Sequence, residues 1–109
     1  MVVHAIHSKA EFDDAINTHQ IVVVDAYATW CGPCRIISPV FERLSETKPQ
    51  AYFVKFDVDE VLDVTKELEI RAMPTFVFFR QGIKGNQITG ANPVALENAI
   101  TMAIELSAS

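Results

Sequence analysis

Two short runs of this chain show no alternation of polar and apolar residues, and they constrain the fold more than any other feature. Ile21 to Val24 is four β-branched residues in succession, and Thr75 to Phe79 holds only β-branched and aromatic residues. A strand that is apolar on both faces must be covered on both faces, so each run predicts a central strand between two helical layers. The length of 109 residues suits a single domain, which we expect to span residues 1–109.

Four other stretches show the three-and-four spacing of apolar residues that predicts amphipathic helices. The first begins at a capping box, Ser8-Lys9-Ala10-Glu11, and the last begins at Asn92-Pro93, where a cap residue precedes proline. The second starts at Cys31 and contains Pro39, which predicts a kink rather than two helices. The positions expected to face the core are Phe12, Ala15 and Ile16, then Ile36, Ile37, Val40, Phe41 and Leu44, then Val61, Val64 and Leu68, and finally Leu96, Ala99, Ile100 and Ala103.

Three further strands are expected at residues 2–6, 51–57 and 87–89, which gives the order βαβαβαββα. Strands separated by helices predict right-handed parallel crossovers with helices on both sheet faces. The last two strands have only turn residues between them, including Gly82 and Gly85, so they predict an antiparallel hairpin. The fold class that follows is α/β, with three layers in the order αβα.

Fourteen acidic residues against nine basic ones give a net charge of −5. Such a surface repels phosphate backbones and anionic membranes, so neither nucleic acid nor a membrane is an expected partner. The apolar runs are far shorter than the roughly 20 residues that span a bilayer. Residues Met1 to Ile6 lack both a basic start and a sustained apolar stretch, so no leader is visible and the reducing cytoplasm is the expected location.

The pair Cys31 and Cys34 carries the clearest chemical signal in the sequence. Such a pair can be half of a zinc site, a structural disulfide or a redox centre. A structural zinc needs about four ligands, and the three histidines all lie far upstream, so we expect no metal. A bridge that encloses only Gly32 and Pro33 closes almost no loop in the unfolded chain and therefore stabilises the fold little. These arguments favour a redox pair.

The position of the pair, between a strand and a helix, predicts different roles for the two thiols. Cys31 should face unpaired backbone N–H groups and the positive end of the helix dipole, which lowers the pKa of its thiol and makes it the attacking sulfur. Cys34 lies one turn inside the helix and should be more shielded. Asp25 follows a buried run, so we expect desolvation to raise its pKa.

Three segments of the sequence are similar to the thioredoxin family. They are Val24-Asp25, the run Ala28-Thr29-Trp30-Cys31-Gly32-Pro33-Cys34-Arg35, and Met73-Pro74-Thr75-Phe76. The likeness extends over nearly the whole chain. It implies the thioredoxin fold, with a mixed sheet of five strands flanked by four helices, which agrees with the element order above.

The resemblance also implies roles for individual residues. Cys31 would be the nucleophile, Cys34 the resolving thiol, and Asp25 the buried acid that helps to deprotonate Cys34 through water. Pro74 would be a cis-proline that faces the dithiol, and the backbone of Met73 would pair with an extended substrate segment. The remaining implied residues are Gly32, Pro33 and Lys55 for redox tuning, and Trp30, Gly90 and Ala91 for an apolar docking rim.

Some of these residues have simpler explanations, and some positions depart from the family pattern. Trp30 could belong only to the core, Lys55 could be a solvated strand residue, and Gly90 could serve only a turn. Ala26 stands where the family usually has an aromatic residue, and Tyr27 stands where tryptophan is frequent. The small Ala26 predicts looser packing beneath the dithiol, or packing filled from elsewhere.

The function implied by the resemblance is reduction of disulfides in target proteins by a monomer that binds no cofactor. A thioredoxin reductase, a flavoprotein that uses NADPH, would recharge the pair. Two alternatives remain open. A disulfide oxidant or isomerase often has histidine before the second cysteine, whereas Pro33 suggests a more reducing pair. A binding module without turnover would not need both cysteines together with Asp25 and Pro74.

Overall fold

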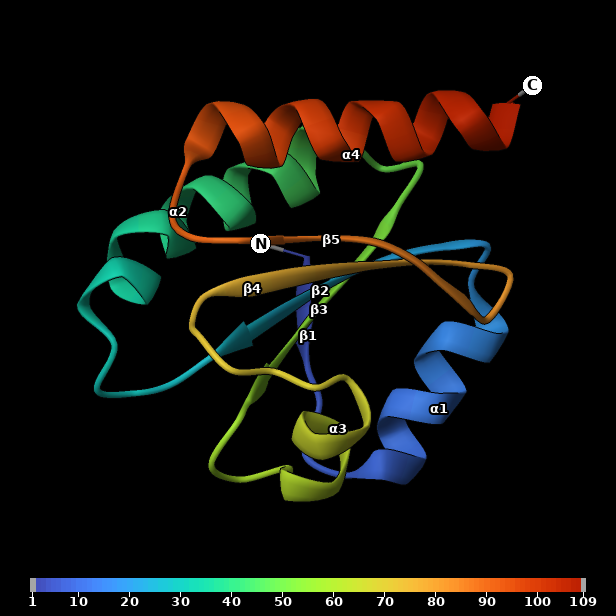
Figure 1. Ribbon diagram of the computed structural model, residues 1–109. Coiled ribbons are helices and arrows are strands. Elements are labelled where there is room, and N and C mark those ends of the chain that lie inside the picture. The colour runs from blue at the N-terminus through green and yellow to red at the C-terminus, as the bar shows by residue number, and fades with distance from the viewer. Residues whose placement is uncertain (1, 109) are drawn as a thin grey trace.

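The computed structural model describes residues 2–108, and its order of elements confirms the predicted βαβαβαββα (Figure 1). The sheet has five strands in the order β1-β3-β2-β4-β5, so β2 is central as expected. The elements are β1 (Val3–Ala5), α1 (Lys9–Thr18), β2 (Ile21–Tyr27), α2 (Gly32–Thr47), β3 (Tyr52–Asp57), α3 (Leu62–Glu67), β4 (Thr75–Arg80), β5 (Ile83–Thr89) and α4 (Pro93–Ala108).

The strand directions confirm only part of the predicted topology. β1 and β2 both pair with β3 in parallel, and β4 and β5 form the expected antiparallel hairpin. The expectation of a parallel crossover from β3 to β4 is wrong, because β4 pairs with β2 in the antiparallel direction. The cause is the short α3, whose six residues extend about 9 Å, whereas the strands it connects are about 20 Å long. The chain therefore re-enters the sheet at the end where it left.

Helices cover both faces of the sheet, with α2 and α4 on one face and α1 and α3 on the other (Figure 1). The predicted core stripes are confirmed with one exception: Ile36 is 75% exposed, whereas its neighbour Ile37 is fully buried. α2 continues through Pro39 as a single helix. Among the described residues, no helix has both the length and the apolar character needed to cross a membrane.

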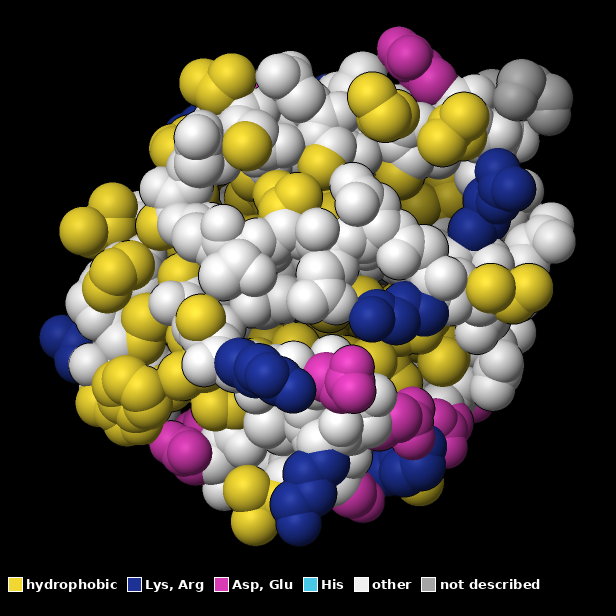
Figure 2. Space-filling view, viewed as in Figure 1, with side chains coloured by type: hydrophobic (Ala, Val, Ile, Leu, Met, Phe, Trp, Pro, Cys, Tyr) yellow, Lys and Arg dark blue, Asp and Glu magenta, His cyan; other side chains and the backbone are white. Residues whose placement is uncertain are grey.

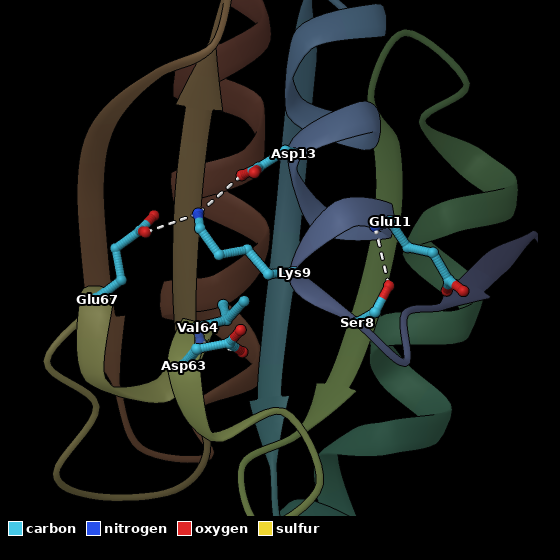
Figure 3. A network of polar contacts seen from close by, with 7 residues as sticks. All are labelled: Ser8, Lys9, Glu11, Asp13, Asp63, Val64 and Glu67. Atoms are coloured by element: carbon cyan, nitrogen blue, oxygen red, sulfur yellow. Dashed lines mark hydrogen bonds and ion pairs between the residues drawn. The ribbon is translucent and has the colours of Figure 1, made fainter.

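Polar contacts join the two helices that cover the lower face in Figure 1. Ser8 caps α1 by accepting a hydrogen bond from the backbone N–H of Glu11, and Glu11 Oε1 accepts from the N–H of His7 rather than from that of Ser8. Lys9 Nζ donates to Asp13 Oδ1 at 3.1 Å within α1 and to Glu67 Oε1 at 2.8 Å on α3 (Figure 3). Lys9 thus links α1 to the helix that precedes the Met73 segment.

The hairpin turn between β4 and β5 is shorter than the sequence suggested. Gly82 lies in the turn with a φ of +80°, a backbone conformation that favours glycine. Gly85 belongs to β5, which begins at Ile83 rather than at Gln87, so the expectation that Gly85 lies in the turn is wrong. The pairing of β4 and β5 shifts register between Val77 and Phe79, which is the bulge that a strand glycine often marks.

Candidate active site

Cys31 and Cys34 form a disulfide where the segment after β2 meets the first turn of α2. Cys31 is the N-cap residue of the helix, and its Sγ accepts a hydrogen bond from the backbone N–H of Cys34 at 3.1 Å. Pro33 lies in the first turn, where its missing N–H leaves no intrahelical bond unmade. Sγ of Cys31 therefore lies at the unpaired N–H groups and positive dipole end of α2, as predicted from the sequence.

Exposure does not distinguish the two cysteines in this disulfide form. Each is 5% exposed, so the expectation that Cys34 is the more shielded residue is not met. The disulfide draws both sulfurs together in the same turn, so each side chain is covered by it. What distinguishes them is their surroundings: Cys31 Sγ lies 3.5 Å from the carbonyl oxygen of Met73, whereas Cys34 lines a pocket on the side of Asp25.

The Met73-Pro74 peptide bond is cis, and this segment packs against the dithiol from a distant part of the chain. Hydrogen bonds hold the segment in place on both sides. The hydroxyl of Thr75 donates to the carbonyl oxygen of Ala72 at 2.7 Å. The backbone N–H of Gly90 donates to the carbonyl oxygen of Pro74 at 2.9 Å. Gly90 has a φ of +107°, so the chain turns sharply there.

Trp30 and Ala91 lie on the accessible surface around the disulfide. Trp30 is 65% exposed, so the alternative that it belongs only to the core is wrong. Its indole Nε1 donates to Asp59 Oδ2 at 2.9 Å, which fixes the ring beside the dithiol turn. Ala91 is half-buried and directly follows Gly90. The sequence-predicted residues of the docking rim thus gather at one end of the sheet.

Asp25 is buried in β2 beneath the dithiol turn, and two more strand residues follow it before β2 ends. Desolvation raises its pKa from 3.8 to about 7, and the charge of Lys55 opposes that rise. The expected direction is therefore confirmed. Its Oδ1 atom has no hydrogen-bond partner among the residues that the structure describes. Lys55 stands opposite Asp25 in the paired strand β3.

Asp25 and Cys34 line the same pocket, which has a volume of about 260 Å³. Asp25, Lys55 and Cys34 all line it, together with Ser38 of α2. Polar groups on several sides make such a pocket suitable for water, which could connect the carboxyl group to the thiol. The ammonium group of Lys55 also lies 5.9 Å from the centre of the Tyr27 ring, so it is not simply a solvated strand residue.

The small side chain of Ala26 lies inside the core. Ala26 is fully buried and belongs to a core cluster that also contains Phe56, its register partner in β3. An aromatic residue on the neighbouring strand thus belongs to the same core cluster as Ala26. Sequence reasoning did not anticipate Asp59, which lies 29 positions after its partner Trp30 and carries no local signal of that contact.

The histidines lie away from the dithiol. The rings of His4 and His19 both stack on Tyr52, with ring centres 4.4 Å and 3.5 Å away. Nδ1 of His7 lies 3.1 Å from Glu60 Oε1. Within the described part of the chain, no three histidine, cysteine or acidic residues gather as metal ligands would.

Comparisons with known proteins agree with this geometry. The Thioredoxin family model matches residues 3–102. The chain is 52% identical over 91 residues to Thioredoxin-1 of Saccharomyces cerevisiae, covering 84% of this chain and 88% of the relative. It is 46% identical to Thioredoxin-2 of Pyricularia oryzae over 93% of this chain, which spans only 59% of that longer relative. The crystal structure of Malassezia sympodialis thioredoxin superposes with a TM-score of 0.90 at 45% identity, covering 94% of this chain and 90% of that one.

Proposed function

The chain belongs to the thioredoxin family and is a thiol-disulfide oxidoreductase, and we propose that Cys31 and Cys34 divide the exchange with protein disulfides between them. The thiolate of Cys31 attacks one sulfur of the target disulfide and forms a mixed disulfide, while the other target sulfur leaves as a thiolate. The thiolate of Cys34 then attacks Sγ of Cys31 and releases the second target sulfur. Two electrons pass to the target, and the Cys31–Cys34 disulfide is formed.

The observation that carries this division is the position of Cys31 Sγ at the N-terminus of α2. The N–H of Cys34 points to that sulfur at 3.1 Å, and such a donor together with the helix dipole stabilises a thiolate. Among the described residues, no comparable donor from the helix end reaches Cys34, so its deprotonation requires a base. Asp25, in the shared pocket, is that base and accepts the proton of Cys34 through water.

The surface around the disulfide receives the target. An extended target segment pairs with the backbone of Met73 beside Cys31, and the cis-proline Pro74 shapes that approach. Trp30, Gly90 and Ala91 form the apolar rim. Gly32, Pro33 and Lys55 tune the redox pair: Pro33 stiffens the turn that Gly32 shares with it, and Lys55 acts through its charge beside Asp25.

The remaining assignments concern the cellular setting. A thioredoxin reductase returns the disulfide to the dithiol with electrons from NADPH, so the chain itself binds no cofactor. Disulfide-containing proteins are the targets, and backbone pairing accepts many sequences. The protein works as a monomer in the cytoplasm, where a reducing environment keeps the dithiol available.

Trapping of the mixed disulfide tests the division of roles. Cys34→Ser lacks the resolving thiol and should accumulate covalent complexes with target proteins that dithiothreitol releases. Cys31→Ser serves as the matched control, since it keeps one cysteine in the same turn but loses the attacking sulfur. Covalent complexes in equal amounts from both variants would contradict the proposed order of attack.

A further inference from the structure

Ile36 is an apolar side chain that the fold leaves in solvent next to the dithiol. It is 75% exposed, although the spacing of apolar residues placed it on the core face of α2. The buried face of that helix is centred instead on Ile37, Phe41 and Leu44. The Ile36 side chain therefore contributes little buried surface to the core. A β-branched residue is also not favoured at an exposed helical position.

The position of Ile36 on α2 brings it close to the reacting sulfur. Gly32 and Pro33 precede it by four and three residues, so all three share one side of the helix. Gly32 and Pro33 are themselves exposed. The helix rises about 1.5 Å per residue, which puts Ile36 roughly 8 Å along the axis from Cys31.

A protein target must cover this position when its disulfide reaches Cys31. Even a small transient interface occupies roughly 600 Å² on each partner, a patch with a radius of about 14 Å. A patch of that size centred on Cys31 is wide enough to include Ile36 as well as the adjacent Trp30. On the face drawn in Figure 2, hydrophobic side chains gather at the left, the end of the molecule where α2 begins.

Exposure alone does not make an apolar residue a docking residue, and this chain provides a matched comparison at another position. Ile83 is 73% exposed, nearly the same as Ile36, but it lies at the start of β5. The turn between β4 and β5 is at the right of Figure 1, at the opposite end of the sheet from the start of α2. Along β5, about 20 Å separate Ile83 from Thr89 at the site end of the strand.

We propose that Ile36 is a docking residue for disulfide-bearing target proteins, packing against an apolar side chain that lies beside the target disulfide. The proposal rests on the exchange function proposed above and extends the docking surface along α2. Targets with apolar residues next to the disulfide are therefore preferred over targets with polar residues there. Only an apolar neighbour makes the burial of the Ile36 side chain favourable.

The test compares Ile36→Gln with Ile83→Gln in the full chain. Each protein is reduced beforehand, and single-turnover rates are measured with insulin as the protein disulfide and with dithiobis(nitrobenzoate) as a small disulfide. Ile36→Gln should lower the second-order rate constant for insulin by roughly fivefold, which corresponds to partial burial of one aliphatic side chain. Its rate with the small disulfide and its reduction potential should match the wild type, and Ile36→Met should restore the insulin rate.

The outcomes separate this proposal from the function on which it rests. A wild-type protein that does not reduce insulin would remove the basis of both. An active wild type whose insulin rate is unchanged in Ile36→Gln would overturn the docking role alone. Equal loss with both substrates would place the effect on the dithiol itself and would also overturn it, as would an equal loss in Ile83→Gln.

Discussion

The buried carboxyl group of Asp25 makes the stability of the protein depend on pH in a direction opposite to that of a salt-bridged acid. Its folded pKa of about 7 lies above the ordinary value of 3.8, so the folded state binds the proton more tightly than the unfolded state. Asp25 therefore favours folding at low pH and opposes it progressively as pH rises from about 4 through 7. Above both values the full penalty of about 4 kcal/mol remains, since each pH unit between the two pKa values corresponds to ~1.4 kcal/mol.

Asp25→Asn should remove this penalty and keep the shape of the side chain. The amide would leave buried polar atoms without partners, which costs about 1–3 kcal/mol, so the net gain at about pH 8 is roughly 1–3 kcal/mol. At about pH 4 the wild-type carboxyl group is protonated and carries no penalty, so only the cost of the amide remains and the variant should be less stable by about 1–3 kcal/mol. The amide cannot accept a proton from Cys34, so resolution of the mixed disulfide should become slower in the same variant.

Denaturant melts across this pH range measure the first effect, and single-turnover exchange rates measure the second. Asp14→Asn on α1 is the matched control, because it makes the same change at an exposed position. Asp14→Asn keeps Asp25 in place and should retain the pH slope that Asp25 causes, whereas the slope of Asp25→Asn should be flatter. An Asp25→Asn variant that is less stable than the wild type at about pH 8 but fully active would show that Asp25 is only a structural residue, and the proton-transfer role would have to be abandoned.

Two further predictions concern the dithiol turn and the hairpin. In the reduced protein at neutral pH, iodoacetamide should modify Cys31 far faster than Cys34, because only Cys31 lies at the helix N-terminus. Mass spectrometry of the alkylated peptides measures the two rates. Faster modification of Cys34 would show that the roles are reversed. Gly82→Ala should destabilise the protein by about 1 kcal/mol or more in denaturant melts, since φ is +80° there and the new Cβ would lie 2.7 Å from Asn17 Oδ1. Gly85→Ala, with an ordinary contact to Phe78, should change stability less, and equal losses would contradict the backbone argument.

The sequence predicted most of the fold because the decisive signals are local. The unalternating run at Ile21 marks a strand covered on both faces, and the caps at Ser8 and Asn92 mark the starts of helices that the structure confirms. Burial of Asp25 follows from the run that precedes it. For the same reason, the direction of its pKa change could be predicted before any contact was known.

The features that could not be predicted depend on distances that a linear pattern does not contain. The direction of β4 depends on how far α3 and its connections carry the chain, and six helical residues fall short of a crossover. The contact between Trp30 and Asp59 joins residues far apart in sequence. Ile36 has the spacing of a core residue, but the face that α2 buries is centred on its neighbour Ile37. In each case the final arrangement depends on how whole elements pack.

A pair that must open and close during each exchange should not be needed to hold the fold together, and the packing around α2 meets this condition. The disulfide joins residues three positions apart, so it restricts the unfolded chain less than a bridge across a longer loop would. α2 is held instead by Ile37, Phe41 and Leu44, which belong to a core cluster on the face that α4 also covers. Those contacts lie further along the helix than the dithiol turn. We therefore expect reduction to free Sγ of Cys31 at an intact helix N-terminus and to keep the geometry that favours its thiolate.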